Sequence, residues 1–587
     1  MPRVIAFLAL LFLAGLTATA ASQEPASRAA PQVNSKTLAG KHFRFSWKSG
    51  ERGGLNGIAT LRKDGRILGI HCPNETFWMV DDRGRLVFKH QDGRISSVFD
   101  KIEIRNGRYH FKGLFTFRKN ILHFLEETTA PRPPHCILPE DAARIVCSSQ
   151  RFVYLDIGEE TVFTLASGKK KTIRLTAVED HRDPVVNLVR RADVRVEVDG
   201  KPLDLVCAPY VLPTEVDGLR IQADTTTGWL PIPKRVQLSL WVASKPVVDT
   251  ARFRFPLRNY RLFSHGLQAY NEPVHIGHKD GDPAGGRFYH NYGVDLAGYE
   301  GREEVVCCTG GVVLRLWPER DPSSIAVADD RGIVWEYGHL DVMASDVKPG
   351  APVRQGQTLG YLGRKGGSGN FSHLHLGVFL TRDDAMVVRN TRNLNLYPWL
   401  VEAWRHQFGP TLMAVARPHH TTRTGDTVHF DGSYSLAGPS QIVDHCWRFH
   451  DGETVKGVRA TKIYKKPGTY MATLRVRDAA GREDVDFCKV KVFTRDRPEP
   501  VTPILFVTYT PTRSIRVNTP VNFRGWVQGS GQRPFSLDFG DSTRVEKYEP
   551  CSEITHRFKK PGLHVVTATA RIEGLPVTQK IKVVVDP

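Results

Sequence analysis

The stretch His290-Asn-Tyr-Gly-Val-Asp295 opens a series of three histidine motifs that decides how the chain folds and which chemistry it can perform. The second motif is Tyr337-Gly-His339-Leu-Asp341, and the third is His373-Leu-His375. Glycines and short apolar runs lie between them, a pattern typical of strands joined by turns. The series therefore predicts a sheet that brings imidazole and carboxylate groups together.

The third motif places two imidazoles on one face of a predicted strand. Side chains alternate along a strand, so His373 and His375 point the same way, about 7 Å apart. One imidazole could bind a metal ion while the other contacts a water molecule or a substrate. His339 follows the predicted strand 332–336 and is flanked by a turn, so it could project into a cleft. The alternative for each motif is a polar histidine on a solvated surface.

The first motif adds a further imidazole, His290, and a carboxylate, Asp295. Two neutral imidazoles and a carboxylate form a normal zinc ligand set, with the fourth position left for water. Zinc lowers the pKa of that water towards about 7 and polarises a scissile carbonyl. A histidine outside the ligand set could accept a proton or stabilise an oxyanion. The motifs together predict metal-assisted amide hydrolysis.

The motifs also resemble those of a known family. In order and spacing, four segments are similar to the lysostaphin-type zinc metallopeptidases: Gly293-Val-Asp295, Tyr337-Gly-His339-Leu, Gly356-Gln-Thr-Leu-Gly360 and Ser372-His-Leu-His375. The resemblance covers about residues 265 to 385 and implies an antiparallel β-sheet with a groove. It implies hydrolysis of peptide crosslinks or stem peptides in bacterial peptidoglycan. It further implies that His290, Asp295 and His375 bind Zn²⁺, that His373 is the general base or orients the water, and that His339 stabilises the transition state.

One spacing departs from the family pattern. The family places its first histidine four residues before the aspartate, whereas His290 precedes Asp295 by five. An odd separation puts the two side chains on opposite strand faces. We expect a bulge at Asn291 or Tyr292 to restore the alignment. In the alternative, Asn291 occupies the ligand position and the site is weak or inactive, with His278 as the best substitute ligand.

The rest of the chain predicts a mainly β, multidomain protein. At 587 residues it is long enough for several cores. Arg3, an apolar run and Ala18-Thr-Ala20 together predict a signal peptide, and hence a secreted or cell-envelope location, periplasmic or extracellular; an uncleaved membrane anchor is the alternative. The expected units are a signal peptide (1–20), a linker (21–36), an all-β domain (37–130), a β-sandwich (131–257), the histidine-bearing domain (258–408, ending in a helix at 397–408) and two modules (409–495 and 496–587).

The two C-terminal modules repeat one pattern. Thr427-Val-His-Phe430 recurs as Pro520-Val-Asn-Phe523, and Tyr464-Lys-Lys-Pro-Gly468 recurs as Phe558-Lys-Lys-Pro-Gly562. The offset is near 90 residues, the size of one β-sandwich, which indicates tandem modules. Trp447-Arg-Phe-His-Asp-Gly452 resembles the PKD domain, an immunoglobulin-like β-sandwich. Such modules are expected to act as spacers or to bind glycans or proteins.

The net charge and the cysteine content limit the kinds of partner and metal site that the chain is expected to have. The formal net charge of +19 suits an anionic partner such as a cell-wall polymer or a membrane surface, although spread Lys and Arg also favour solubility. The sequence contains no nucleic-acid-binding motif and no membrane-spanning run after the signal segment. The nine cysteines include no CxxC pair, so a thiolate zinc site is not expected.

These observations favour a secreted zinc metalloendopeptidase that cleaves peptide bonds in peptidoglycan. The first alternative is a catalytically degenerate scaffold that binds cell wall or regulates another hydrolase. The second is a surface adhesion protein dominated by its tandem β modules.

Overall fold

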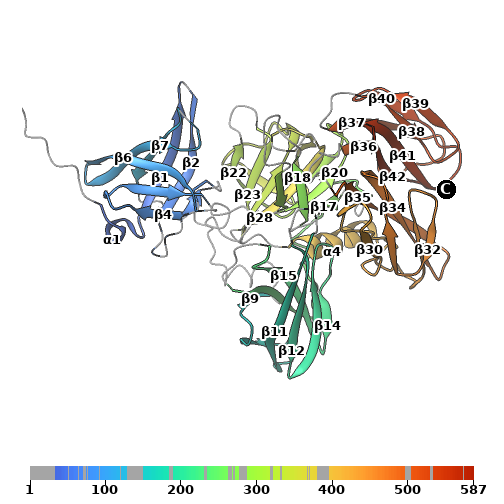
Figure 1. Ribbon diagram of the computed structural model, residues 1–587, viewed down its shortest axis with the longest axis horizontal. Coiled ribbons are helices and arrows are strands. Elements are labelled where there is room, and N and C mark those ends of the chain that lie inside the picture. Colours follow the sequence, from blue (N-terminus) through green and yellow to red (C-terminus); the bar gives the residue numbers. More distant parts are fainter. Residues whose placement is uncertain are drawn as a thin grey trace, which may run out of the picture.

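The computed structural model describes most of the chain from Val33 onward (Figure 1). The described residues are 33–587 except 51, 62, 64, 66, 71–73, 76, 91–92, 119, 129–149, 184, 186–188, 230–233, 262–266, 269–271, 277–286, 292, 318–321, 331–332, 367, 369–370, 380–394, 496–503, 529–532 and 573. The expected signal peptide, residues 1–20, and His278 lie outside them.

The N-terminal unit is one antiparallel sheet wrapped around an aromatic core, in the order β3-β2-β1-β8-β7-β6-β5-β4. Phe43, Phe45 and Phe88 are fully buried inside it. Asn34 caps the short helix α1 and Val33 is buried, so the linker expected up to residue 36 ends earlier. The elements are α1 (Ser35–Leu38), β1 (His42–Ser49), β2 (Arg52–Leu61), β3 (Ile67–Ile70), β4 (Phe77–Val80), β5 (Leu86–Lys89), β6 (Ile95–Arg105), β7 (Arg108–Phe115) and β8 (Leu122–Glu127).

The second unit is a sandwich of two four-stranded antiparallel sheets, β10-β11-β12-β13 and β14-β15-β16-β9. Alternating apolar side chains of both sheets, such as Val194, Val196 and Leu238, share one core, as in sandwiches generally. The strands are β9 (Arg151–Leu155), β10 (Glu160–Thr164), β11 (Lys170–Arg182), β12 (Val189–Val198), β13 (Lys201–Cys207), β14 (Thr214–Val216), β15 (Leu219–Thr226) and β16 (Val236–Val242).

The histidine motifs lie in a third unit built on a seven-stranded sheet, β17-β20-β28-β24-β23-β22-β26, with a two-stranded sheet (β18-β19) and a three-stranded sheet (β21-β27-β25) beside it. The strands are β17 (Leu267–Gln268), β18 (Pro273–Ile276), β19 (Arg287–His290), β20 (Val294–Ala297), β21 (Glu304–Val306), β22 (Gly310–Trp317), β23 (Ser324–Ala328), β24 (Val334–Gly338), β25 (Leu340–Met343), β26 (Pro352–Arg354), β27 (Thr358–Leu362) and β28 (His373–Phe379). The antiparallel sheet expected here is confirmed.

The helix expected over residues 397–408 is also confirmed, as α4 (Tyr397–Phe408). Pro398 in its first turn lacks only an N–H that has no intrahelical partner there, and Gly409 ends the helix. Trp399 and Trp404 are buried against the third unit, and the indole N–H of Trp404 donates to the carbonyl of Tyr260 at 3.0 Å.

The two C-terminal modules are not structurally independent domains, because strands of both belong to one nine-stranded sheet. β34 pairs with β42 in parallel through Thr469 and Val577. The first module holds β29 (His420–Arg423), β30 (Thr427–Asp431), β31 (Ile442–Arg448), β32 (Thr454–Lys456), β33 (Arg459–Ile463), β34 (Gly468–Asp478) and β35 (Glu483–Phe493). The second holds β36 (Ile504–Thr510), β37 (Val521–Gln528), β38 (Phe535–Asp538), β39 (Arg544–Tyr548), β40 (Glu553–His556), β41 (Gly562–Ile572) and β42 (Leu575–Val585).

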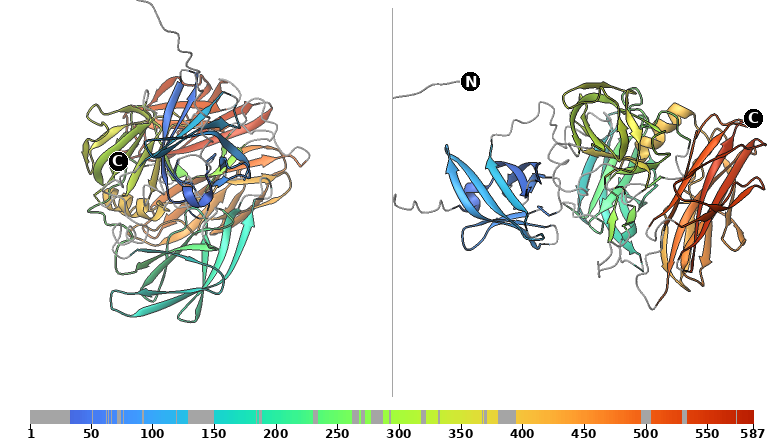
Figure 2. Two further views of the ribbon diagram at one scale, coloured as in Figure 1. Left: turned by 90° about the vertical axis from the view of Figure 1, so that its left-hand side faces the viewer. Right: turned by 90° about the horizontal axis from the view of Figure 1, so that it is seen from above.

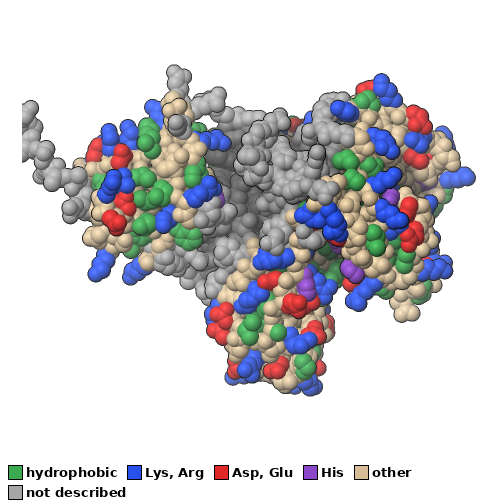
Figure 3. Space-filling model, viewed as in Figure 1, with side chains coloured by type: hydrophobic (Ala, Val, Ile, Leu, Met, Phe, Trp, Pro, Cys, Tyr) green, Lys and Arg blue, Asp and Glu red, His purple; other side chains and the backbone are tan. Residues whose placement is uncertain are grey.

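The views in Figures 1 and 2 show how the units are arranged. The C-terminal modules lie against the third unit, and the N-terminal unit lies on the other side of it. On the face in Figure 3, Lys and Arg side chains are spread over the N-terminal unit, the sandwich and the C-terminal modules, interspersed with Asp and Glu. Within the described residues, no helix has the length and apolar character needed to cross a membrane.

Candidate metal centre

Three neighbouring strands bring the three motifs together. Asp295 on β20 lies opposite His375 on β28, and Gly338 at the end of β24 lies opposite the same residue on its other side. His339 follows β24 directly, with a φ of 65° that turns the chain at this point. The register of the sheet therefore converts three distant sequence motifs into one cluster.

Four of the five predicted site residues meet in this cluster. His375 Nδ1 lies 2.7 Å from Asp295 Oδ1, and His373 Nε2 lies 3.6 Å from the same oxygen. The ring of His339 has its centroid 4.6 Å from that of His373 and 6.0 Å from that of His375. Asp295, His373 and His375 are 3%, 4% and 5% exposed, so the cluster sits in a nearly closed environment where electrostatic interactions are strong.

Hydrogen bonds to main-chain carbonyls select the tautomers of two histidines. His373 Nδ1 lies 2.7 Å from the carbonyl of Phe371, and His339 Nδ1 lies 2.8 Å from that of Lys365. A carbonyl oxygen can only accept, so Nδ1 carries the proton in both rings. In each neutral ring, Nε2 is consequently the atom that can accept a proton.

The pKa values follow from burial and from the mutual proximity of these groups. Burial by itself raises the pKa of Asp295, but the His373 charge and the His375 hydrogen bond outweigh it, so the pKa lies below its usual value. Burial lowers the pKa of His373. For His339, burial followed by the charges of His373 and His375 lowers the pKa to about 3. An ionised carboxylate beside neutral imidazoles is the protonation state that metal binding needs.

The fifth predicted residue, His290, ends β19, where it pairs with Pro273 of β18. The structure describes its backbone but not its side chain. β19 and β20 belong to different sheets, and the strand is interrupted between them, so alternation no longer fixes the relative faces of His290 and Asp295. Asn291, in the interruption, is 1% exposed, and its main-chain N–H donates to the carbonyl of Glu272 at 2.9 Å.

The donor chemistry of this cluster suits zinc, since it offers carboxylate oxygen beside imidazole nitrogen. Asp295 and His375, two of the predicted ligands, are neighbours, with Oδ1 of the first 2.7 Å from Nδ1 of the second. Among the described residues, no set of three or more His, Cys, Asp or Glu side chains is arranged to hold a metal ion. The predicted third ligand, His290, remains a prediction.

Sequence patterns did not identify two aromatic residues at this site. Phe371 stacks on His373 with ring centroids 4.7 Å apart, and Phe506 of the second C-terminal module stacks on Phe371 at 4.8 Å. Phe371 stands two residues before His373 but outside β28, so the alternation of a strand does not mark it as a neighbour of the imidazole. No local pattern connects Phe506 to the motifs.

Two segments of the chain match models of known protein families, and one of these segments contains the histidine cluster. Residues 289–387 match the family model of Peptidase family M23, and residues 410–492 match that of the PKD domain. The chain therefore carries a lysostaphin-type peptidase domain, here the third unit, joined to a PKD domain. The resemblance inferred from the motifs is confirmed by these two family models.

Individual proteins are similar only over parts of the chain. A curated relative, Collagenase ColA of Bacillus cereus, is 36% identical over 64 residues, which are 11% of this chain and 6% of the collagenase. A solved structure of a putative glycyl-glycine endopeptidase LytM from Ruminococcus gnavus is 26% identical, covers 26% of this chain and 59% of its own, and has a TM-score of 0.18. A zinc-containing peptidase from Vibrio cholerae is 13% identical, with coverages of 52% and 85% and a TM-score of 0.19.

Proposed function

We propose that the chain is an exported, zinc-dependent endopeptidase that hydrolyses peptide bonds in peptidoglycan. The observation that carries this proposal is the convergence of Asp295, His339, His373 and His375 from three separate motifs into one buried cluster. Buried titratable groups that meet without forming a simple ion pair favour a functional site over a structural one. The match of this domain to a peptidase family supports peptide-bond hydrolysis as the reaction.

In this proposal His290, Asp295 and His375 would hold a zinc ion, which would lower the pKa of a bound water and polarise the scissile carbonyl. Asp295 stays ionised, in keeping with its lowered pKa. The sheet register holds Asp295 and His375 opposite each other, so neither ligand has to move far. Low exposure of both side chains excludes bulk water from the reacting groups.

The two remaining histidines move protons through their Nε2 atoms. The Nδ1 of His373 is bonded to the carbonyl of Phe371, so its Nε2 accepts the proton of the attacking water. The Nδ1 of His339 is likewise occupied, by the carbonyl of Lys365. His339 is neutral at the start of the reaction because its pKa is lowered to about 3, so its Nε2 can accept a proton as the transition state forms and thereby stabilise it.

A second candidate function is supported by a specific observation at Asn291. This residue stands four positions before Asp295, where the family has its histidine, and it is buried, with its side-chain oxygen 3.5 Å from the main-chain N–H of Gly293. If Asn291 rather than His290 takes the ligand position, an amide oxygen replaces an imidazole and zinc binding weakens. The domain would then bind the cell wall or regulate another hydrolase without cleaving it.

Elemental analysis of the purified full chain separates the two functions. About one zinc ion per chain is expected in the wild type, with loss in His290→Ala and in His375→Ala and retention in Asn291→Ala. Hydrolysis of purified peptidoglycan should be abolished by His373→Ala while most of the zinc stays bound. A wild type that takes up no zinc when supplied with it would support the scaffold, and loss of zinc in Asn291→Ala alone would assign the ligand to Asn291.

A further inference from the structure

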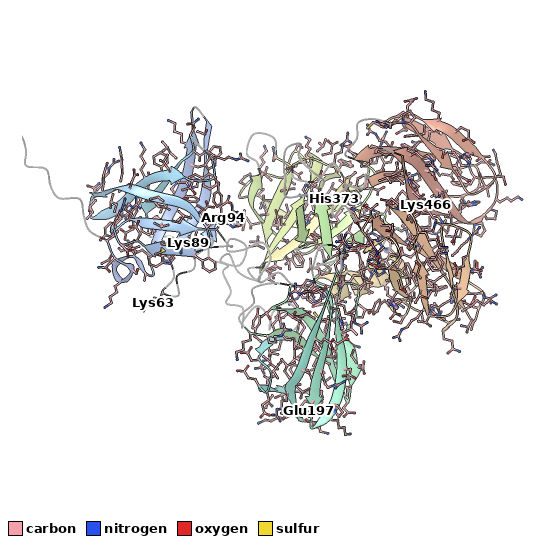
Figure 4. All side chains as sticks on the ribbon, viewed as in Figure 1. Lys63, Lys89, Arg94, Glu197, His373 and Lys466 are labelled. Atoms are coloured by element: carbon pink, nitrogen blue, oxygen red, sulfur yellow. The ribbon has the colours of Figure 1, made fainter. Side chains whose placement is uncertain are left out.

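A row of stacked rings runs from the catalytic cluster into the second C-terminal module. His373 and Phe371 stack at 4.7 Å with their planes 22° apart, and Phe371 and Phe506 stack at 4.8 Å with planes 23° apart. Phe506 in turn stacks on Trp526 at 5.4 Å. The first two rings belong to the peptidase domain, and the last two lie on β36 and β37 of the module. His373 lies on the side of the peptidase domain that faces the C-terminal modules (Figure 4).

Polar contacts also join the module to the peptidase domain. Arg524 of the module and Arg364 of the peptidase domain both pair with Glu300, at 3.4 and 3.1 Å. Tyr299 donates a hydrogen bond to the carboxylate of Glu553. Further contacts are the ion pair of Arg261 with Asp586 at 3.0 Å and the hydrogen bond from Thr512 Oγ1 to the carbonyl of Asn259 at 2.9 Å.

Apolar packing also holds the second C-terminal module against the peptidase domain. Buried side chains of the two parts belong to one continuous apolar core, which contains Tyr260 and Leu359 of the peptidase domain and Leu505, Tyr509 and Ile515 of the module. Contacts between domains that move relative to each other are small and polar, whereas this one continues a core. The module is therefore rigidly attached beside the cluster and does not move away from it as a separate domain.

The orientation of His373 depends on its neighbours. The torsion that turns an imidazole ring about its Cβ–Cγ bond has broad minima, so surrounding contacts must define the ring plane. Phe371 supplies two of these contacts, a carbonyl at Nδ1 and a ring against the imidazole face. Phe371 is itself only partly buried, and Phe506 is the aromatic partner that packs on it from the module.

We propose that the second C-terminal module is an integral part of the catalytic centre, in which Phe506 acts as a positioning residue that holds His373 through Phe371. The proposal rests on the proposed function for its kinetic consequence, but the geometry it describes does not depend on turnover. The sequence predicted that such modules act as spacers or bind glycans or proteins. In this proposal the peptidase domain needs the module to orient its general base, His373.

Three variants test the role of the ring. Phe506→Leu keeps apolar volume and removes the stacking plane, whereas Phe506→Tyr keeps the plane. Phe523→Leu is the matched control, because it makes the same change in the core of the same module, where Phe523 packs on Tyr509 and Phe539. Thermal unfolding of each variant shows how much of any effect is general destabilisation.

The first measurement is peptidoglycan hydrolysis by the full chain with zinc bound. An aromatic stack contributes about 0.5–1.5 kcal/mol, so Phe506→Leu is expected to lower kcat by about two- to tenfold. KM should change by less than about twofold, since orientation of a base acts on turnover more than on binding. Phe506→Tyr should restore kcat, and Phe523→Leu should leave it unchanged. Equal losses in Phe506→Leu and Phe523→Leu would overturn the proposal, and a higher kcat in Phe506→Leu would show that the module is an inhibitory cover.

The second measurement does not require activity. The rate at which diethyl pyrocarbonate modifies His373, followed by mass spectrometry of the full chain, reports how well the ring is held and covered. It should rise about threefold or more in Phe506→Leu, in proportion to the lost stacking energy, and stay at the wild-type value in Phe506→Tyr and Phe523→Leu. If the wild type has no hydrolase activity, this pattern still supports the placement of His373 while the proposed function fails. An unchanged rate in Phe506→Leu would refute the placement itself.

Discussion

Gly293 provides a sharp test of the site geometry, because its missing side chain leaves space for the ring of His375. A Cβ added at residue 293 would lie 2.4 Å from the carbonyl oxygen of Leu376 and 2.9 Å from both Cε1 and Nε2 of His375. Real Cβ atoms essentially never approach other atoms closer than 3.0 Å, so β20 and β28 would have to separate by about 0.6 Å. That displacement falls on the strand pair that sets Asp295 against His375.

Gly293→Ala should therefore cost about 1–3 kcal/mol of local stability, the usual penalty for overpacking a core. A misplacement of about 1 Å in a catalytic site costs about a hundredfold in rate, so a shift of about 0.6 Å should reduce activity by about tenfold or more. Hydrogen exchange of peptides from β20 and β28 measures the stability change, and elemental analysis measures the accompanying loss of zinc affinity.

Gly377→Ala is the matched control, because Gly377 flanks the same imidazole. Its added Cβ would lie 3.7 Å from His375 Nε2 and 3.7 Å from Cβ of Glu336, which are ordinary contacts. Alanine is also favoured over glycine within a strand by about 0.5–1 kcal/mol. Gly377→Ala should thus be neutral or stabilising. Equal behaviour of the two variants in hydrogen exchange and zinc content would refute the geometry described for the site.

Two further predictions concern buried charges. Burial raises the pKa of Glu303 to about 8 from its usual 4.5, so the folded chain keeps a proton that the unfolded chain releases. The stability that this proton contributes is present below about pH 4.5 and is lost as the pH rises to about 8, which lowers the free energy of unfolding by up to about 5 kcal/mol. Glu303→Gln should remove this pH dependence, as measured by denaturant unfolding across this pH range. Lys582 pairs with the buried Asp484 at 2.7 Å, so Lys582→Met should destabilise the C-terminal modules by about 3–5 kcal/mol in urea unfolding. Lys580→Met should cost far less, because the ammonium of Lys580 donates to the hydroxyl of Thr473 and pairs with no carboxylate among the described residues. Similar losses in the two variants would contradict this account.

Much of the cluster of Asp295, His339, His373 and His375 could be predicted from the sequence, because it depends on short-range order. The two-residue period of a strand places His373 and His375 on one face, and the turn after a strand places His339 at an edge. The need for a carboxylate beside two imidazoles then pointed to Asp295, whereas its pairing with His375 across the two strands came from the structure. The structure brings these four side chains together as the motifs predict.

The segment from His290 to Gly293 shows where strand periodicity stops being informative. Alternation assumes one continuous strand, but β19 and β20 pair with different neighbours. The bulge expected at Asn291 or Tyr292 remains a prediction, as does the ligand role of His290. The tandem repeat likewise predicted two sandwich modules but not their shared sheet, because Thr469 and Val577 meet through tertiary packing that no local pattern encodes.

The shared sheet of the C-terminal modules also limits how this protein can be divided. A chain cut within residues 496–503 would remove the partner of the first residues of β34 and uncover the apolar cluster of Met471, Val485 and Phe487, against which Leu563 and Val565 pack. Unpaired strand edges and uncovered apolar patches promote aggregation. Recombination that shuffles single modules between proteins would therefore have to transfer both together, and the peptidase domain with them, as one heritable piece.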